Sequence, residues 1–387
     1  MDRLPQRIDL NPTDPDVFCP EWWTRIHLIQ NNDAFRYKPC CLYRDISSQS
    51  IANPNTIYHT HNQSAVVAQA RQDNLNGVKN AGCAMCYESE QRGITSSRQY
   101  KIQEYGQQNV PVSGYLDLNL GNLCNLSCAI CGPWNSTNWA AKAPVAWGYE
   151  RFTQKYLKNK PNQIDDPELF LSLHTIQLQG GEVFLEPDYY KFFSNMGKYR
   201  TYDNLRVIIF TNGTVKPSAA FWDILNQCGQ VEIFFSIDDI KQRFEYQRDG
   251  AQWDQVVENM HWFQDHAGAG IKFNINPTYS MLNIYYLADL HDYLQTEFPD
   301  IGINYNSFND HAMSRAKCQA SAMTAEVRQA CIDRVQHIPE LDFLSAYISI
   351  SENQPYTAFL DYIRHFDQMS KKSYAATHPE FYQLITQ

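Results

Sequence analysis

Residues 111–310 alternate between strand-like and helix-like segments, and this alternation constrains the fold more than any other feature. Short runs of apolar and β-branched residues recur along this region, and amphipathic stretches with a helical period lie between them. Each strand–helix unit takes about 30 residues, which suits a right-handed crossover between parallel strands. The sequence therefore predicts an α/β fold with a parallel sheet.

The expected strands are 115–120, 175–179, 205–210, 231–237, 272–277 and 301–305. The expected helices between them are 134–157, 188–198, 218–227, 253–266 and 283–298. The alternation stops near residue 308, and the later amphipathic helical patterns are 324–335 and 357–369. We therefore divide the chain into segments 1–110, 111–310 and 311–387.

Composition and charge exclude several classes of protein. The chain has 387 residues, of which 43% are hydrophobic and 19% charged, and its formal net charge is -10. This is the composition of a soluble globular protein with two or three domains. General nucleic-acid binding is disfavoured because phosphates require concentrated Lys and Arg. The apolar runs have only the length of strands and no signal peptide is visible, so we expect a cytoplasmic protein without a membrane partner.

Three closely spaced cysteines follow the first expected strand. Cys124, Cys128 and Cys131 form a C-x3-C-x2-C pattern. Thiolates at this spacing can wrap a loop around a cubane iron–sulfur cluster, which normally takes four cysteines. Three ligands leave one iron with an open position, and an open position distinguishes a reactive metal site from a structural one. A structural zinc site, or three unrelated cysteines, is the alternative.

A second motif, Gly180-Gly181-Glu182, follows the second expected strand. The glycines permit close backbone approach, and the carboxylate suits an ammonium group. The cysteine triplet and this motif together resemble the radical S-adenosylmethionine (radical SAM) superfamily. The resemblance implies a partial (β/α)6 barrel core, a 4Fe–4S cluster on the three cysteines, SAM on the open iron, and contact between Gly-Gly-Glu and the amino group of SAM.

The resemblance also implies SAM contacts at the ends of later strands. Ile130 stands where the family commonly has an aromatic residue against the adenine of SAM. Asn212 follows the third strand, near the expected place of the methionine moiety, although a simple Asn-Gly turn also explains it. Ser236 and Asp238 follow the fourth strand, where i and i+2 share a face. They resemble the family's ribose and carboxylate contacts to SAM.

Two further candidates lie later in the chain. Arg248 belongs to the segment 245–253, which we expect to open a helix and which resembles a motif of enzymes with auxiliary clusters. Its guanidinium suits the SAM carboxylate, because Arg forms bidentate pairs; a surface arginine in a helix-capping loop is the alternative. Asn283 begins the fifth expected helix, near the segment that lines SAM in the family, and a helix cap also explains it.

Segment 1–110 carries a second group of cysteines: Cys19 precedes a predicted hairpin over residues 26–41, Cys40 and Cys41 end it, and a C-x2-C pair follows at 83–86. The candidate ligands are Cys19, Cys40, Cys83 and Cys86, with Cys41 as the alternative to Cys40. The pattern resembles the twitch or SPASM auxiliary iron–sulfur modules of radical SAM enzymes, here placed before the core. Four cysteines with one C-x2-C also fit zinc.

The remaining cysteines have no partner pair in the sequence. Cys228, Cys318 and Cys331 are interpreted as buried small hydrophobic residues. Segment 311–387 is expected to be a helical C-terminal extension.

The resemblance implies a concrete activity. The reduced cluster would give one electron to SAM, and cleavage would yield methionine and a 5′-deoxyadenosyl radical that abstracts hydrogen from a substrate. No catalytic side chain beyond the cluster site is assigned. A peptide or protein side chain is the first candidate substrate, and a small metabolite or nucleotide is the second. Flavodoxin or ferredoxin is the expected kind of electron donor.

A protein of a different class would fit the cysteines as well. A non-catalytic zinc or electron-transfer protein needs no SAM-shaped constellation of polar residues. The two hypotheses therefore differ on whether the strand-end residues Glu182, Asp238 and Arg248, together with Ser236, converge beside the cysteine triplet.

Overall fold

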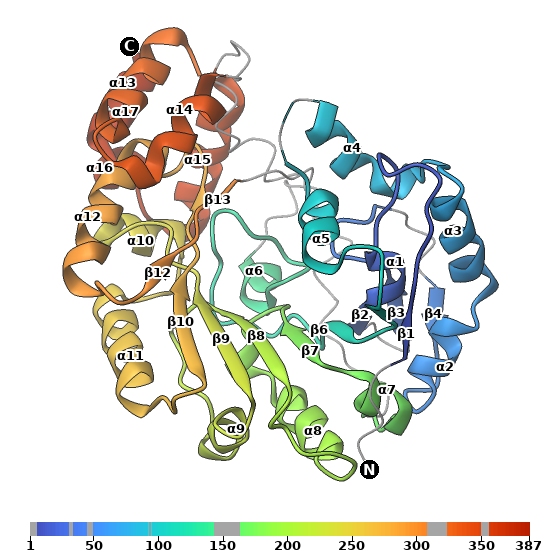
Figure 1. Ribbon diagram of the computed structural model, residues 1–387. Coiled ribbons are helices and arrows are strands. Elements are labelled where there is room, and N and C mark those ends of the chain that lie inside the picture. Colours follow the sequence, from blue (N-terminus) through green and yellow to red (C-terminus); the bar gives the residue numbers. More distant parts are fainter. Residues whose placement is uncertain are drawn as a thin grey trace.

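A computed structural model describes residues 6–30, 34–44, 49–91, 93, 95–142, 163–307, 323–349 and 356–387. Its centre is a nine-stranded sheet in the order β12-β10-β9-β8-β7-β6-β2-β3-β4 (Figure 1). The six expected strands are β6 (Tyr115–Asn119), β7 (Thr175–Leu178), β8 (Arg206–Thr211), β9 (Gln230–Phe235), β10 (Ile271–Ile275) and β12 (Gly302–Ile303). They lie side by side in sequence order and all pair in parallel. The predicted α/β fold with a parallel sheet is confirmed.

Helices connect these strands. The expected ones are α6 (Thr137–Lys142), α8 (Pro187–Met196), α9 (Ala219–Leu225), α11 (Trp253–His266) and α12 (Leu287–Glu297). Most of the expected helix over 134–157 lies outside the described residues. Two helices were not predicted, namely α7 (Pro167–Ser172) and α10 (Lys241–Gln247). The helix expected from residue 283 opens with a 3-10 turn at Ile284–Tyr286 instead of an α-helical one.

The two faces of the parallel sheet differ in polarity because side chains alternate along each strand. On one face Leu116, Ile176 and Ile233 are fully buried. Helix α11 covers this face, with the rings of Phe235 and Phe263 centred 5.3 Å apart. The residues in register on the opposite face are mostly polar or charged, namely Tyr115, Asp117, Thr175, Gln177, Arg206, Gln230, Glu232, Lys272 and Asn274, and the apolar ones among them are Ile208, Phe210 and Phe234.

The N-terminal segment extends the same sheet. The predicted hairpin is confirmed as β2 (Arg25–Gln30) and β3 (Phe35–Lys38), and β4 (Gln49–Ile51) follows at the edge. Strand β2 pairs in parallel with β6, whereas β3 and β4 pair antiparallel. The sheet therefore runs across residue 110, where we placed a domain boundary. The helices of this segment are α1 (Glu21–Thr24), α2 (Ile57–Asn62), α3 (Ala65–Leu75), α4 (Ala84–Gln91) and α5 (Ser97–Tyr105).

The short strands and the C-terminal helices complete the fold. Small two-stranded sheets form from β1 (Arg7–Ile8) with β5 (Val110–Pro111), and from β11 (Thr278–Tyr279) with β13 (Asn306–Ser307). The C-terminal helices are α13 (Ala325–Val335), α14 (Asp342–Ser349), α15 (Thr357–Ser370), α16 (Tyr374–Thr377) and α17 (Pro379–Thr386). They lie beside α10 and α12, and α13 and α15 confirm the predicted helical patterns (Figure 1, orange to red).

Two of the unpaired cysteines agree with their interpretation as hydrophobic residues. Cys228 and Cys331 are buried, and Cys318 lies outside the described residues. In the part of the chain that the structure describes, the helices are too short or too polar to cross a bilayer.

Candidate functional site at the cysteine loop

The segment 120–136, here called the cysteine loop, leaves the end of β6 and folds back on the start of α6. The Ser136 hydroxyl donates to the Leu126 carbonyl at 2.5 Å. The Trp139 indole N–H donates to the Cys128 carbonyl at 2.8 Å. Trp139 is fully buried, so the loop backbone is fixed by a large side chain of the helix that follows it.

The Gly-Gly-Glu segment packs directly on the cysteine loop. The Gly181 N–H donates to the Gly121 carbonyl at 3.1 Å, and the Glu182 N–H donates to the Leu123 carbonyl at 2.7 Å. A Cβ atom at Gly181 would lie 2.2 Å from the Leu123 carbonyl oxygen. The glycine is therefore required by a close backbone approach, as predicted, and the neighbouring group is the backbone of the loop.

The Glu182 carboxylate is buried between the ends of β7 and β8. It accepts hydrogen bonds from the Thr211 hydroxyl at 2.8 Å, the Asn212 N–H at 2.8 Å and the Phe184 N–H at 3.1 Å. Burial raises the pKa of Glu182, and these hydrogen bonds and the charge of Arg248 oppose that rise. The motif residue thus faces the interior beside the loop, not solvent.

Asn212 joins the turn after β8 to the cysteine loop. Its amide nitrogen lies 3.9 Å from the Cys124 sulfur and donates to the Asn125 side chain at 3.1 Å. Its oxygen accepts from the Thr214 N–H at 2.9 Å, which is the arrangement of an ordinary Asx turn. Asn212 therefore forms the expected turn and also contacts the triplet.

Arg248 and Asp238 form a buried ion pair next to Cys128. The Asp238 carboxylate lies 2.7 Å from one terminal guanidinium nitrogen and 3.0 Å from Nε. The other terminal nitrogen lies 3.9 Å from the Cys128 sulfur. Arg248 is 8% exposed, so the alternative of a surface arginine is wrong. Its segment opens a helix as predicted, because α11 begins at Trp253, whose N–H donates to the Glu245 carboxylate at 2.9 Å, and Arg248 itself follows the last residue of α10.

The residues around Arg248 hold the cysteine loop through its backbone. The Ser127 N–H donates to the Asp249 carbonyl at 2.8 Å, and the Ala129 N–H donates to the Gln247 carbonyl at 2.7 Å. The Asp249 carboxylate accepts from Lys142 at 2.7 Å. The sequence analysis did not single out Asp249, because such a contact joins two distant segments.

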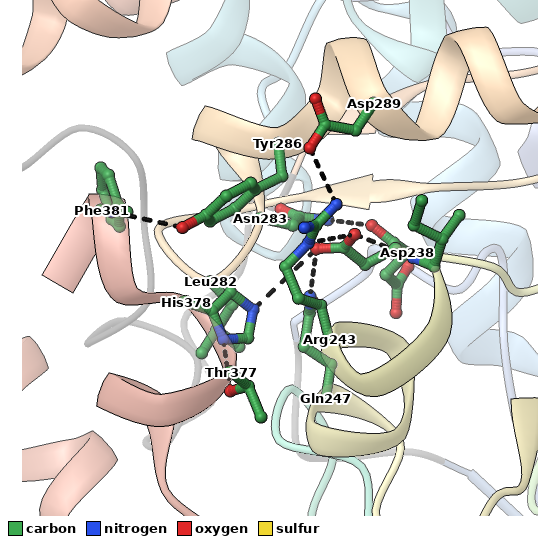
Figure 2. A network of polar contacts seen from close by, with 12 residues as sticks. Asp238, Arg243, Gln247, Leu282, Asn283, Tyr286, Asp289, Thr377, His378 and Phe381 are labelled. Carbon is green, nitrogen blue, oxygen red and sulfur yellow. Dashed lines mark hydrogen bonds and ion pairs between the residues drawn. The ribbon is translucent and has the colours of Figure 1, made fainter.

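Asn283 lies beside Asp238 but binds backbone groups (Figure 2). Its amide nitrogen donates to the carbonyls of Asp238 at 2.7 Å and Thr278 at 3.0 Å, and its oxygen accepts from the Ser280 N–H at 2.8 Å. Asn283 therefore stands at the predicted N-cap position of the 3-10 turn, but its side chain makes no capping hydrogen bond to that turn. Asn283 ties together the loops that follow β9 and β10.

Ser236 and Ile130 are two further predicted contacts to SAM. Strand β9 ends at Phe235, and the Ile237 N–H bonds back to the Phe235 carbonyl at 3.0 Å. The prediction that Ser236 and Asp238 share a strand face is therefore wrong, because the chain turns between them. Ser236 bonds to the Thr211 carbonyl through its backbone N–H at 2.9 Å. Ile130 is partly buried and packs against the main hydrophobic core.

The N-terminal cysteines gather around α1. Burial raises the pKa of the Cys19 thiol, and Glu21 and the thiols of Cys83 and Cys86 raise it further. Burial also raises the pKa of Cys40, with Glu21, Cys41 and Cys19 as additional causes. Cys19 therefore lies within electrostatic reach of Cys40, Cys83 and Cys86, and the side chain of Cys41 is exposed.

Two buried polar residues hold this cysteine group in place. The Arg98 guanidinium donates to the Phe18 carbonyl at 2.8 Å and pairs with Glu90 at 2.6 Å. The Asn74 side chain accepts from the Cys19 N–H at 3.0 Å. Arg98 and Asn74 are both buried, so these contacts fix the start of α1.

A buried polar network connects α1 to the parallel sheet. Arg25 pairs with Glu21 at 2.6 Å and with Asp117 at 3.1 Å, and His27 lies 2.6 Å from the same Asp117 carboxylate. Asp117 stands on β6, opposite His27 of β2, on the polar face of the sheet. The alternation Tyr-Leu-Asp-Leu-Asn over 115–119 was the sequence signal for this side chain.

The donors around the triplet fit an iron–sulfur cluster. The Leu126 N–H lies 3.5 Å from the Cys124 sulfur, and N–H groups of Asn212 and Arg248 lie 3.9 Å from the sulfurs of Cys124 and Cys128. Burial raises the pKa of Cys124 to about 12, so this thiol needs a bound cation to become a thiolate. Hydrogen bonds to sulfur are a usual feature of such clusters. Within the described residues, groups of three His, Cys, Asp or Glu that could hold a single metal ion are absent.

The buried Asp239, next to Asp238, gives a prediction for pH dependence. Its carboxylate pairs with Arg243 at 2.8 Å, accepts from Gln247 at 3.1 Å and lies 3.9 Å from His378 (Figure 2 shows Arg243, Gln247 and His378). Arg243 also pairs with Asp289 at 3.0 Å. Burial raises the pKa of Asp239 from 3.8 to about 7. Burial and the charge of Arg243 hold the pKa of His378 well below 6.5.

The two groups act in opposite directions on stability. Between pH 3.8 and about 7 the folded chain keeps the Asp239 proton that the unfolded chain loses, so the free energy of unfolding falls as pH rises. Below 6.5 the unfolded chain charges His378 and the folded chain does not, so stability rises with pH. Asp239→Asn removes the falling contribution and leaves that of His378. We therefore expect the free energy of unfolding of the variant to rise more steeply with pH than that of wild type, by up to about 1.4 kcal/mol per pH unit. Urea unfolding from about pH 4.5 to 7 measures this, and parallel curves for wild type and variant would contradict it.

Comparisons with known proteins leave the family open. The sequence matches no family model and no curated protein. Similar solved structures include anSMEcpe with bound AdoMet, at 14% identity and a TM-score of 0.40, covering 62% of this chain and 64% of that one. Another is SuiB of Streptococcus suis bound to S-adenosylmethionine, at 11% identity and a TM-score of 0.40, covering 83% and 69%. The chain thus spans 64% of the length of anSMEcpe.

Proposed function

We propose that the chain is a radical SAM enzyme whose cluster is held by Cys124, Cys128 and Cys131. The observation that carries this proposal is the convergence of buried polar side chains on the cysteine loop. Asn212 approaches Cys124, and Arg248 approaches Cys128. An electron carrier or a zinc site has no need of this constellation, so the convergence favours an enzyme over the non-catalytic alternative.

Glu182, Asp238 and Arg248 would have different roles in binding SAM. Glu182 has three hydrogen-bond donors on a carboxylate with about four acceptor sites, which leaves capacity for the amino group of SAM. Asp238 fixes the orientation of Arg248, and the remaining guanidinium nitrogen points to Cys128. When bound, the reduced cluster supplies one electron for cleavage of SAM to methionine and a 5′-deoxyadenosyl radical, which abstracts hydrogen from the substrate.

We further propose a polar substrate, with a peptide or protein side chain as the first candidate. The six parallel strands would curve into a partial barrel, whose inner surface would be the polar face of the sheet. Asp117, Arg206 and Glu232 stand on that face. Their charges suit a polar substrate better than a lipid. A small metabolite or a nucleotide is the second candidate.

The N-terminal group is proposed to hold an auxiliary iron–sulfur cluster on Cys19, Cys40, Cys83 and Cys86. Its support is that Cys83 packs against the small hydrophobic core that contains Cys19, and that Cys19 lies within electrostatic reach of Cys40 and Cys86. Cys40 is preferred over Cys41 because the charge of Cys19 acts on Cys40 and the Cys41 side chain is exposed. Flavodoxin or ferredoxin is proposed as the electron donor.

The test is anaerobic reconstitution with iron and sulfide, followed by iron counting and a SAM-cleavage assay under dithionite. Wild type is expected to bind about eight irons and to form 5′-deoxyadenosine. The Cys124→Ala/Cys128→Ala/Cys131→Ala variant should keep about four irons and form none. Cys228→Ala, a buried cysteine outside both groups, is the matched control. Bound zinc without 5′-deoxyadenosine from wild type would refute the enzyme and favour the binding protein.

A further inference from the structure

Helix α15 and the turn after it make contact with two segments of the candidate SAM site, the cysteine loop and the segment around Arg248. The Tyr362 hydroxyl donates a hydrogen bond to the carbonyl of Ala129, which follows Cys128 in the cysteine loop. Tyr362 is buried, and 233 residues of sequence separate it from Ala129. A residue of the C-terminal extension therefore holds the backbone of the triplet itself.

The same segment holds both sides of Arg248. The Tyr246 hydroxyl donates to the Asp367 carboxylate at 2.6 Å. The Lys372 ammonium donates to the Glu245 carbonyl at 2.6 Å and lies 3.2 Å from the Asp249 carboxylate. Residues before and after Arg248 are thus tied to one turn of the extension.

Aromatic packing fills the space between these contacts. The Phe366 ring lies 6.5 Å from the ring of Trp139 and 5.4 Å from that of Tyr246. Trp139 binds the Cys128 carbonyl, and Tyr246 precedes Arg248 by two residues. Phe366 is fully buried, so the cysteine loop and the Arg248 segment cannot move independently of α15.

We propose that α15 and the following turn act as a positioning element, in which Tyr362 sets the cysteine loop and Lys372 sets the Arg248 segment. The purpose of this positioning rests on the function proposed above, but the contacts themselves exist without a cluster. The cysteines are on a loop, and a loop that carries a metal site needs outer contacts to hold its ligands in place.

The first test is amide hydrogen exchange on the metal-free chain, comparing Tyr362→Phe with Tyr286→Phe. Tyr286 is the matched control, because its hydroxyl also joins the extension to the core, by a bond to Glu380 at 2.8 Å, but away from the cysteine loop. Tyr362→Phe is expected to speed exchange in the loop about fivefold, the effect of one lost hydrogen bond, and to leave β9 unchanged. Equal effects of both variants on the loop, or no effect, would overturn the proposal.

The second test follows the release of iron to a chelator after reconstitution. We expect faster release from Tyr362→Phe than from wild type and Tyr286→Phe. We also expect weaker SAM binding by Lys372→Met, with Lys371→Met, at the exposed neighbouring position, as its control. Unchanged release and binding would refute the positioning role. Failure of wild type to bind iron would instead refute the proposed function, and hydrogen exchange would still decide the positioning.

Discussion

Arg248→Met is expected to lower the free energy of unfolding by about 3–5 kcal/mol, because it leaves the Asp238 carboxylate buried without its cation. Asp238 is 1% exposed, and both its contacts with Arg248 are charge-assisted hydrogen bonds. The variant also removes the N–H group near the Cys128 sulfur. SAM binding should therefore fall with stability, and urea unfolding together with equilibrium SAM binding measures the two effects.

Arg206→Met provides the matched control for this loss. Arg206 pairs with Glu232 at 2.7 Å, but its side chain is 39% exposed, so the screened pair contributes less than about 1 kcal/mol. Arg248→Lys adds a second comparison, since it keeps the charge and loses the planar fork of donors. If Arg248→Met were no more destabilising than Arg206→Met, the ion pair beside Cys128 would not have the structural role inferred for it.

Gly181→Ala is expected to displace the cysteine loop and to cost at least about 1–3 kcal/mol of stability. Its new Cβ would lie 2.2 Å from the carbonyl oxygen of Leu123 and 2.6 Å from the carbonyl carbon. Both atoms belong to the backbone, so neither can rotate away as a flexible side chain would. Thermal unfolding measures the loss of stability, and iron bound per chain after reconstitution measures the displaced loop.

A glycine with more room is the control for that substitution. At Gly270 the nearest atoms to an added Cβ are carbonyl oxygens at 3.3 Å, so Gly270→Ala should change stability by no more than about 0.5 kcal/mol. A normal iron content in Gly181→Ala would show that the loop tolerates the shift. The requirement for glycine in this motif would then have another origin than the contact with Leu123.

Local patterns in the sequence were enough to predict the framework. The short apolar runs and the helical period between them are properties of neighbouring residues, and they predicted the strand segments and an α/β fold with a parallel sheet. The triplet and Gly-Gly-Glu were found at strand ends because each motif is contiguous. The same local reasoning failed at Ser236, because hydrophobic alternation cannot show that the strand ends at Phe235.

Contacts between distant segments could be seen only in the tertiary structure. Arg248 and Cys128 are 120 residues apart, and the sequence left Arg248 equally suited to a surface loop. Asp249 and Tyr362 had no motif around them, yet each binds the cysteine loop.

The sequence by itself therefore determined the strand and helix segments and which short motifs stand at the strand ends, because those follow from periodicity and local spacing. The tertiary structure decided which side chains surround the cysteines and what holds them there. The physical reason is that burial, ion pairing and the loss of room around Gly181 depend on segments that meet only after the chain has folded.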